Sequence, residues 1–320
     1  MTRAADWLTS RPLLFQAPVG SIASAELAVA VCNAGGIGQI AGTWRSTDQL
    51  RVAIRTIKER TTAPFGVNFV LGFPFEDQLT LALAEGIPIV SFFWGDASRH
   101  VQEVKSAGAV AIQVVGCAEE AQTAEAAGFD LVVAQGHEAG GHIRGQLGTF
   151  VLVPLVRDAV GIPVIAAGGI ADRRGVAAAL ALGATGVWVG TAFLLAQEAN
   201  IHSTYREKVR TASAEDAIYS SVFEIGWPAA PHRSLKNSTI ERWQQHGRPL
   251  ITARSGADDV VARRADGSPI PRYHFAAPTR DMTGNIEAMA LYAGQSVGLV
   301  LYECPAAEIV TELLAGFDRR

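Results

Sequence analysis

Cysteine is scarce in this sequence. The three that occur, Cys32, Cys117 and Cys304, lie far apart and form neither a Cys-x-x-Cys pair nor a disulfide framework. A small disulfide-stapled secreted domain and a thiolate-held metal site are therefore not expected. The same scarcity favours a reducing compartment, and we predict a cytoplasmic protein.

Long apolar runs are missing as well. No stretch of about 18 apolar residues occurs, which argues against a membrane-spanning helix. The first residues lack the apolar core and the small-residue cleavage site of a signal peptide. The chain has 27 Lys and Arg residues against 31 Asp and Glu residues, a net charge of −4, and no basic stripe. We therefore expect neither a membrane nor nucleic acid as a partner.

Several catalytic motifs are also absent. The sequence has no His-x-His, no His-Glu-x-x-His and no Cys/His cluster with the spacing of metal ligands, so we expect no metal. It has no Gly-x-Ser-x-Gly elbow for hydrolysis by a Ser/His/Asp triad. Lys105 and Lys208 lack the position at a strand end that would suggest a Schiff base.

What the sequence does contain is a repeated unit. A helical segment ends on a glycine and a short apolar run follows, as in AEGIPIVSFFWG and ALGATGVWVG. Glycine suits that place because the residue after a helix often adopts the left-handed conformation. The apolar runs lack polar alternation, so both of their faces should be covered, as in a parallel sheet beneath helices. The helix-ending glycines are Gly86, Gly108, Gly128, Gly161 and Gly183.

Counting the apolar runs gives eight strands, which is the number of a TIM barrel. We predict an α/β fold, a TIM (β/α)8 barrel formed by residues 1–200 and 281–320. An open, doubly wound sheet is the alternative. The strand regions lie near Phe15, Gly38, Phe65, Ile87, Ala109, Leu131, Ile162 and Gly186.

Residues 201–280 differ in character. They are more polar, with scattered aromatic residues and the segment GWPAAPHRSLKN. We interpret them as a smaller, mainly helical domain that covers the barrel as a lid. Beyond it, residues 280–298 are predicted to form a helix followed by a YAGQ turn. Residues 303–317 are predicted to form an amphipathic helix that returns to the barrel.

The centre of the sequence is the stretch LVVAQGHEAGGHIRG, from Leu131 to Gly145. Its first part indicates a buried strand, and its second part a loop whose glycines let the backbone approach something closely. His142 is the reactive candidate, because histidine titrates near neutrality and can act as acid or base. It could equally be a loop histidine bonded to the backbone. His137 is more typical of a surface or structural residue, and the role of Glu138 stays open.

Glycines also follow the seventh and eighth predicted strands. Gly168 and Gly169 end the segment IPVIAAGG, and Gly190 and Thr191 end GVWVGT, where a helix is predicted to start. Because strand C-terminal ends meet at one face of a barrel, these turns could hold a phosphate on backbone N–H groups. Alone, the first turn could be a tight βα connection. Asn68, inside the third strand, is either a satisfied core amide or a ligand contact.

Several of these segments resemble those of the nitronate monooxygenase family, formerly called 2-nitropropane dioxygenases. VSFFWG is similar to the family's strand-4 signature, and GHEAGGHIRG to its EAGGHRG loop. The segments FQAPVGSIASAELAVAVCNAGGIGQIAG and AAGGIADRRGVAAALALGATGVWVGTAFL resemble its opening and phosphate-binding parts. The resemblance covers most of the chain.

The resemblance implies a TIM barrel that binds FMN without a covalent bond. The implied base is His142, and Tyr292, Gln295 and Ser296 could face the flavin. Two departures are Trp188–Ala192 in place of Gln-Met-Gly-Thr-Arg and Ile143 between the loop histidine and Arg144. The expected cofactor-binding residues are Asn68, Gln135, Gly140, Gly168, Gly169, Trp188, Val189, Gly190 and Thr191.

The implied activity is the oxidation of an alkyl nitronate, such as propionate 3-nitronate, by oxygen to a carbonyl compound and nitrite. Its partners would be a small-molecule substrate and oxygen, and the protein could form a homodimer. The same barrel occurs in relatives that use NAD(P)H to reduce quinones or enoyl thioesters. The retention of Arg144 near His142 favours the monooxygenase. Two further alternatives are a barrel that isomerises a phosphorylated metabolite and a non-catalytic flavin-binding protein.

Overall fold

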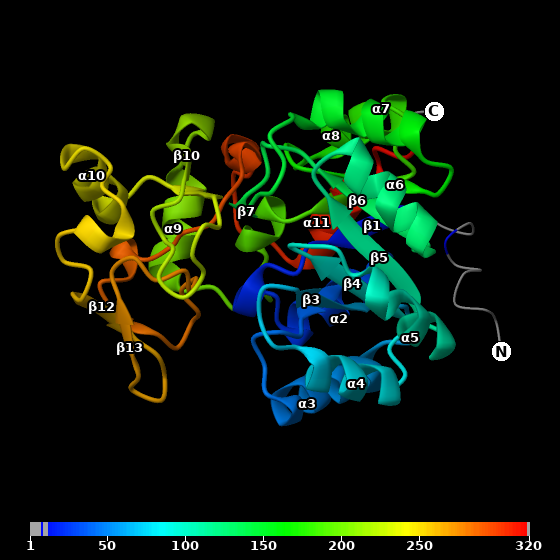
Figure 1. Cartoon of the computed structure of the whole chain (residues 1–320), viewed down its shortest axis with the longest axis horizontal. Helices are drawn as coiled ribbons and strands as arrows, with labels where there is room; N and C mark the ends of the chain where they lie inside the picture. Colours follow the sequence, from blue (N-terminus) through cyan, green and yellow to red (C-terminus); the bar gives the residue numbers. More distant parts are fainter. Residues whose placement is uncertain (1–7, 9–11, 319–320) are drawn as a thin grey trace.

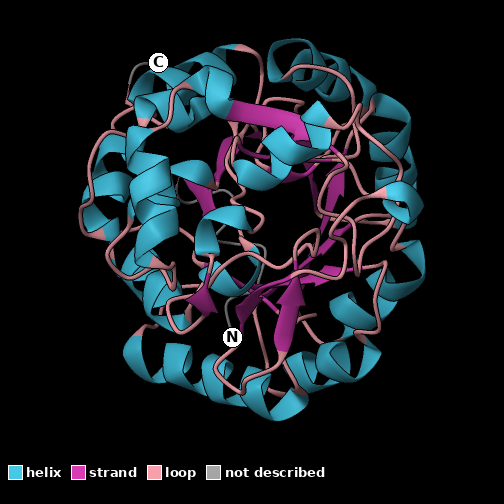
Figure 2. Ribbon diagram, turned by 90° about the vertical axis from the view of Figure 1, so that its left-hand side faces the viewer, coloured by secondary structure: helices cyan, strands magenta, loops and turns pink. Residues whose placement is uncertain are grey.

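Eight parallel strands form the centre of the computed structural model, which describes residue 8 and residues 12–318. Helices surround the ring of strands (Figure 2). The order around the sheet is β1-β9-β8-β6-β5-β4-β3-β2, with every pairing parallel. The strands are β1 (Leu13–Gln16), β2 (Gln39–Ala41), β3 (Gly66–Val70), β4 (Ile89–Phe93), β5 (Val110–Val115), β6 (Leu131–Gln135), β8 (Val164–Ala167) and β9 (Gly186–Val189).

The sheet closes between its two edge strands, β1 and β2. A parallel bridge joins Phe15 to Ile37, just before β2. The side chain of Gln16 accepts a hydrogen bond from the Gln39 N–H at 3.0 Å, and Gln39 Nε2 donates to the Gln16 carbonyl at 3.1 Å. The predicted TIM barrel is therefore confirmed, and the open doubly wound sheet is excluded.

The alternation of side chains along each strand separates two apolar layers. In β1, Leu13 and Phe15 point into the barrel, whereas Leu14 packs against the surrounding helices. Both layers are buried, which explains why these strands show no polar alternation in sequence.

Helices cover the outside of the barrel, and α11 completes the ring by packing against α2 and α8. The predicted return of the chain's last helix to the barrel is thus confirmed. Ser46 and Gln49 form a reciprocal capping box at the start of α3. The helices are α2 (Ala25–Asn33), α3 (Thr47–Arg60), α4 (Glu76–Ala84), α5 (Val101–Ser106), α6 (Ala118–Ala127), α7 (Thr149–Ala159), α8 (Arg173–Ala181) and α11 (Ala306–Leu314).

A smaller unit, yellow to orange in Figure 1, lies beside the barrel. It contains two helices and two three-stranded sheets, so the prediction of a mainly helical unit is wrong. One sheet has the order β10-β11-β7 and the other β13-β12-β14. The elements are α9 (Ser203–Thr211), β10 (Ala217–Ser220), β11 (His232–Leu235), α10 (Ser238–Gln245), β12 (Val260–Arg263), β13 (Pro269–Pro271) and β14 (Thr283–Gly284), with β7 (Gly141–His142) contributed by the glycine-rich loop.

The helix predicted for residues 280–298 is also wrong. That segment pairs its backbone with other parts of the chain: the Leu235 N–H donates to the Leu291 carbonyl, and Asn237 Nδ2 donates to the carbonyls of Glu287 and Met289. Tertiary bonds of this kind override a weak local preference for helix. The helical structure in that segment is limited to the short 3-10 turns η6 (Ile286–Ala288) and η7 (Gln295–Leu299), which follow strand β14. The other 3-10 turns of the described chain are η1 (Gly20–Ile22), η2 (Ser98–His100), η3 (Thr191–Leu195), η4 (Ala214–Asp216) and η5 (Ile251–Ala253).

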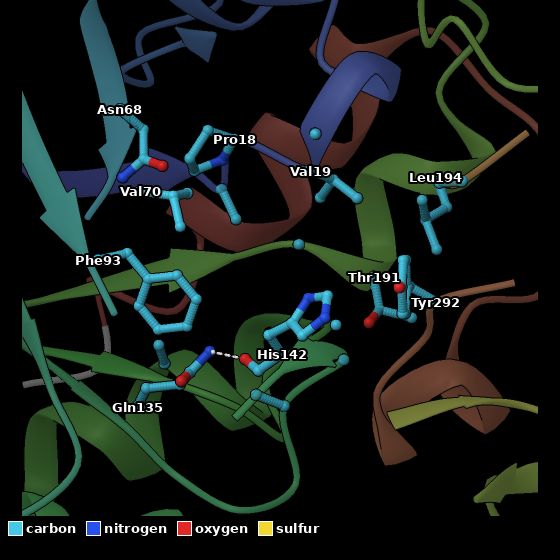
Figure 3. A pocket seen from close by; sticks show the side chains of 18 of the residues that line it. Pro18, Val19, Asn68, Val70, Phe93, Gln135, His142, Thr191, Leu194 and Tyr292 are labelled. Carbon is cyan, nitrogen blue, oxygen red and sulfur yellow. Dashed lines mark hydrogen bonds between the residues drawn. The ribbon is translucent and has the colours of Figure 1, made fainter. Parts of the chain in front are cut away.

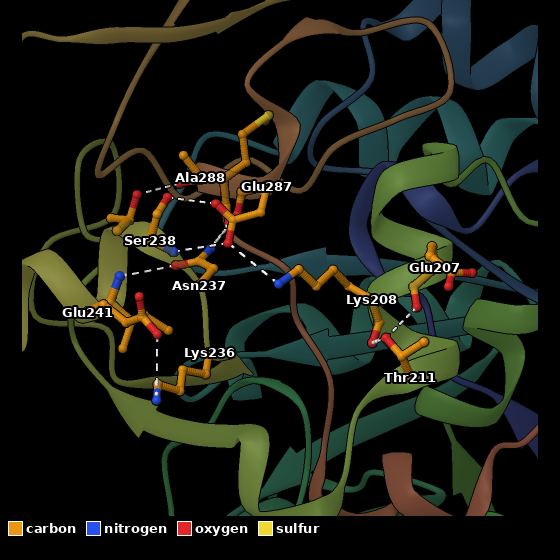
Figure 4. A network of polar contacts seen from close by, with 12 residues as sticks. Glu207, Lys208, Thr211, Lys236, Asn237, Ser238, Glu241, Glu287 and Ala288 are labelled. Carbon is orange, nitrogen blue, oxygen red and sulfur yellow. Dashed lines mark hydrogen bonds and ion pairs between the residues drawn. The ribbon is translucent and has the colours of Figure 1, made fainter.

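A polar network centred on Glu287 ties the smaller unit together (Figure 4). Its carboxylate accepts bonds from the Ser238 N–H at 3.0 Å and the Ser238 hydroxyl at 2.6 Å, and it faces Lys208 Nζ of α9 at 3.6 Å. Asn237, which caps α10 through a bond from the Ile240 N–H, is buried in the same network. The network thus holds α9, α10 and η6 in one arrangement.

None of the helices in the described part of the chain is long and apolar enough to cross a bilayer.

Candidate active site

A cavity of about 400 Å³ opens at the C-terminal ends of the barrel strands, the face on which TIM barrels carry their active sites. Loops after β1, β6, β8 and β9 form one side of it, and the smaller unit contributes Trp227, Phe275 and Met282. Figure 3 shows side chains from distant parts of the chain, among them Val19, Gln135 and Thr191, converging on the same space.

All but one of the predicted cofactor-binding residues line this cavity. The exception is Val189, whose side chain packs in the layer between strands and helices because it alternates with the inward-facing Trp188. Tyr292 and Ser296 line the cavity as expected, whereas Gln295 is exposed and lies outside it. The residues that do line it are Asn68, Gln135, Gly140, Gly168, Gly169, Trp188, Gly190 and Thr191.

The two glycines after β8 form an unusual turn. Gly168 and Gly169 have φ values of 102° and 73°, the left-handed region that side chains rarely enter. A Cβ on Gly168 would lie 2.9 Å from the Gly136 carbonyl oxygen. Thr191, after the adjacent strand β9, starts a five-residue 3-10 helix rather than the α-helix we predicted. The backbone turn is therefore present, but without a long helix dipole behind it.

The glycines of the loop after β6 pack closely against the protein itself. A Cβ on Gly140 would lie 2.4 Å from the Gly294 nitrogen, and one on Gly136 would lie 2.0 Å from Thr149 Oγ1. The close approach that the sequence predicted is thus an approach to the 293–294 segment and to the start of α7. Gly140 lines the cavity nonetheless.

His142 is held by both parts of the molecule. As half of β7, it pairs in antiparallel register with His232 of β11 in the smaller unit. From the barrel side, Gln135 Nε2 at the end of β6 donates to the His142 carbonyl at 3.1 Å, a bond drawn in Figure 3. The backbone of the candidate base is therefore fixed where the two units meet.

The ring of His142 lies among aromatic side chains. It stacks on Trp227 with 3.8 Å between ring centres and 25° between planes, and Tyr292 lies 5.4 Å away. Burial, with a smaller contribution from His232, lowers the pKa of His142 well below its usual value. Within the described residues its Nε2 has no hydrogen-bond partner. The imidazole is thus neutral, with a buried nitrogen left unsatisfied.

The other two polar residues of the loop have structural roles. Glu138 accepts bonds from the Thr149 N–H at 2.8 Å and the Thr149 hydroxyl at 2.9 Å, which fixes the loop to the start of α7. His137 contacts Arg233, whose guanidinium donates to the His137 carbonyl at 2.8 Å, and it lies against the Tyr219 ring. Neither residue lines the cavity, so neither directly orients His142.

Asn68 satisfies both of the interpretations that the sequence left open. Its Nδ2 donates to Ser91 Oγ at 3.0 Å, and Ser91 in turn donates to Gln39 at 3.2 Å inside the barrel. It also lines the cavity. Gln113 of β5 points outward and donates to the carbonyl of Gly95 at 3.0 Å, so it braces the loop after β4 instead.

Arg144 is not where the resemblance suggested. With Ile143 fully buried before it, the arginine turns away from the cavity and pairs with Glu120 at 2.7 Å. The expectation that an arginine near His142 favours the monooxygenase therefore loses its structural basis.

Sequence reasoning did not bring together the aromatic wall that closes one side of the cavity. It consists of Trp44, Phe93, Trp227 and Phe275, packed with Trp94 beside them. Trp94 has a φ of 72°, which is rare for a bulky residue. The tryptophans of FFWG and GWPAAP were visible signals, but only the fold places these segments side by side. Arg264, which also lines the cavity, had no signal in the sequence.

These residues fit a flavin nucleotide. The left-handed Gly168–Gly169 turn exposes backbone for a phosphate, and Asn68 and Gln135 offer amides beside apolar walls suited to a flat ring. His142, whose Nε2 is unsatisfied, lines the same cavity and would lie beside such a ligand. Among the described residues, no group of His, Cys, Asp and Glu side chains is arranged to hold a metal ion.

Comparison with known proteins agrees with this site. The chain is 37% identical to (3aS,4S,5R,7aS)-5-hydroxy-7a-methyl-1-oxo-octahydro-1H-indene-4-carboxyl-CoA dehydrogenase from Mycobacterium tuberculosis, over 73% of this chain and 65% of that relative's length. It is 33% identical to nitronate monooxygenase from Pseudomonas aeruginosa, over 94% of this chain and 95% of that one. The structure of FabK from Thermotoga maritima superposes with a TM-score of 0.84 at 33% identity, covering 99% and 96%.

The family profile described as nitronate monooxygenase matches residues 2–74 and 67–316, which is nearly the whole chain. Members of this family are oxidoreductases and are in general flavin-dependent. With the cavity at the expected end of the barrel and the profile spanning both units, the chain belongs to the nitronate monooxygenase family.

Proposed function

We propose that this protein is an FMN-dependent nitronate monooxygenase, which oxidises an alkyl nitronate such as propionate 3-nitronate with oxygen to a carbonyl compound and nitrite. The observation that carries the proposal is the buried, neutral His142, whose Nε2 is unsatisfied in the wall of a glycine-lined cavity. The match to the family profile supports the same reaction class.

Different residues of the chain would bind the cofactor and accept the proton. Bound FMN would supply the redox chemistry, taking electrons from the substrate and passing them to oxygen. Gly168, Gly169 and Gly190 would hold the phosphate on their backbone, while Asn68 and Gln135 position the ring.

His142 would act on substrates that arrive as neutral nitroalkanes. Its Nε2 would accept the acidic α-proton, since burial lowers the pKa of His142 and keeps the ring neutral at pH 7. A nitronate has already lost that proton and would not need the base. Trp227 and Tyr292 cover the ring and exclude water from it.

The visible spectrum of the purified protein is the first test. A yellow protein with flavin absorption is expected, and a colourless one would favour a barrel that acts on a phosphorylated metabolite without a redox cofactor. The second test mixes the protein without oxygen with propionate 3-nitronate and separately with NADPH. Bleaching of the flavin by the nitronate alone is the expected result.

A second candidate function is the NAD(P)H-dependent reduction of an enoyl thioester or quinone. The displacement of Arg144 favours it, because that arginine was the feature separating the two activities. The similarity to a carboxyl-CoA dehydrogenase and to FabK supports this alternative as well. Rapid bleaching by NADPH, with a slow response to nitronates, would establish it in place of the monooxygenase.

A further inference from the structure

One side chain of the cavity carries a permanent charge. Arg264 sits in the turn between β12 and β13, where its N–H donates to the Ser268 carbonyl at 3.0 Å and its carbonyl accepts from the Gly267 N–H at 2.9 Å. These two bonds close a tight hairpin, so the position of the Arg264 backbone is well defined. Among the described residues that line the cavity, it is the one Arg, Lys, Asp or Glu.

In the described part of the chain, the guanidinium of Arg264 forms no direct ion pair. No carboxylate in the described part of the chain lies within 4.0 Å of its guanidinium. Asp266, whose pKa is lowered first by bonds from Ser268 and to a smaller extent by the charge of Arg264, accepts from the Ser268 N–H at 2.9 Å. Asp259 faces Arg242 and Arg272. An arginine that serves only the fold usually has such a partner when it is partly buried.

The surroundings of Arg264 also favour an anion. Burial and the charge of Arg264 lower the pKa of nearby His274 to about 4, so His274 is neutral and Arg264 carries the positive charge at this end of the cavity. The other cavity residues from this unit, including Phe275 and Met282, are apolar. In such surroundings a guanidinium binds a carboxylate or phosphate more strongly than it would in open water.

We propose that Arg264 binds an anionic group, a carboxylate or a phosphate, on the part of the substrate that lies away from the reacting carbon. The inference rests on the proposed function, since it assigns the substrate's far end to the smaller unit and its reacting end to the His142 side of the same cavity. Two sources share this chemistry: the carboxylate of a small nitronate and a phosphate of a coenzyme A thioester.

The test compares two nitronates of similar shape, propionate 3-nitronate and propyl-1-nitronate, in which a methyl group replaces the carboxylate. With Arg264→Met, kcat/KM for the carboxylate-bearing nitronate should fall about ten- to hundred-fold through KM, with little change for propyl-1-nitronate. Arg264→Lys should recover part of the loss, because it retains the charge without the bidentate geometry.

Arg263→Met is the matched control. Arg263 is the preceding residue, is exposed, and donates to the Gly267 carbonyl at 3.0 Å without lining the cavity. Arg263→Met removes one positive charge from the same hairpin. A general effect of that charge on anion binding would therefore be the same in both variants. Equal behaviour of Arg263→Met and Arg264→Met towards every anionic probe would overturn the proposal.

A second arm identifies the source of the anion and separates this inference from the proposed function. Titration calorimetry of the flavin-loaded protein with 3-nitropropionate, 1-nitropropane and coenzyme A requires no turnover. Loss of 3-nitropropionate binding in Arg264→Met identifies a carboxylate, and loss of coenzyme A binding identifies a phosphate. A protein that fails to oxidise nitronates yet shows either loss would refute the proposed function and retain the anion site. Unchanged binding of all three ligands in Arg264→Met would refute the anion site at Arg264.

Discussion

At the scale of single residues, the site depends on the two histidines that face each other across β7 and β11. His142 lines the cavity with an unsatisfied Nε2, whereas His232 is fully bonded. The Nε2 of His232 accepts from the Phe223 N–H at 3.2 Å and its Nδ1 bonds the Ala230 carbonyl at 2.9 Å. That pair of bonds leaves His232 neutral and structural, and leaves His142 as the side chain available for chemistry.

Replacing His142 with Asn tests its role as a base. Turnover of a neutral nitroalkane should fall about 10²- to 10⁴-fold, since proton transfer then lacks its acceptor. Turnover of the pre-ionised nitronate should be largely spared. Steady-state kinetics on both forms measure this, and an equal loss on both would refute the assignment. His137→Asn, in the same loop but outside the cavity, should leave both rates close to those of the unaltered protein.

His232 makes stability depend on pH. Its pKa is lowered from 6.5 to about 4 by burial, so between these values the unfolded chain binds a proton that the folded chain does not. Stability is therefore complete above pH 6.5 and is lost as the pH falls towards 4, by about 2 kcal/mol at pH 5 from this residue. Urea unfolding at pH 7.5 and pH 5 measures the difference.

The matched variants for this prediction are His232→Gln and His246→Gln. The first should show a smaller difference in unfolding free energy between the two pH values, although it is less stable at both. The second changes an exposed histidine at the end of α10 and should keep the full difference. A full difference in both variants would mean that another group is responsible.

At the scale of elements, the strand-end turns decide what the barrel can bind. Gly169 holds a left-handed conformation without crowding, since a Cβ there would make only van der Waals contact with Glu138 at 3.6 Å. The left-handed conformation of Gly169 is therefore set by the course of the backbone at the cavity. It does not result from a lack of room for a side chain. This separates it from Gly140, whose Cβ would clash with Gly294.

Gly169→Ala should weaken FMN binding about tenfold or more, because the strained backbone would leave the conformation that faces the phosphate. Gly108→Ala is the control: it has a φ of 79°, near the 73° of Gly169, and lies in open space at the end of α5. Both variants should lose about 1 kcal/mol of stability without flavin. Fluorescence titration with FMN should separate them, and equal affinities would contradict the phosphate assignment.

Elements also show where local sequence was a sufficient guide. The barrel strands and their helices follow from apolar runs ending at glycines, because each βα unit is stabilised largely by its own neighbours. The helix prediction for residues 280–298 was wrong because the backbone of this segment bonds to Asn237 and Leu235, which are far away in sequence. The expectation that Arg144 lies near His142 was wrong because the inserted residue Ile143 is buried and the Arg144 side chain turns towards Glu120.

At the scale of the whole molecule, the barrel and the smaller unit share a sheet. The glycine-rich loop of the barrel supplies β7 to the sheet of β10 and β11. The segment around Tyr292 adds further contacts, since Tyr205 of α9 donates to its carbonyl and its own hydroxyl donates to the Phe275 carbonyl at 2.7 Å. Neither unit can rearrange without changing the surroundings of His142.

This coupling predicts a single cooperative unfolding transition. Far-ultraviolet circular dichroism and tryptophan fluorescence should report the same urea midpoint, because Trp227 of the smaller unit packs on His142 of the shared sheet. Two separated midpoints, with the fluorescence change preceding the loss of helix, would show that the smaller unit unfolds alone.

The sequence by itself determined the barrel, the end of it that carries the site, and a set of cavity-lining residues that includes Asn68, Gln135 and His142. It could do so because strand order and the glycines at strand ends are local properties, and parallel strands bring their C-terminal ends to one face. Only the tertiary structure decided that Glu138 and Arg144 leave the cavity and that Arg264 enters it. Those outcomes depend on contacts between segments distant in the chain, and no local pattern encodes them.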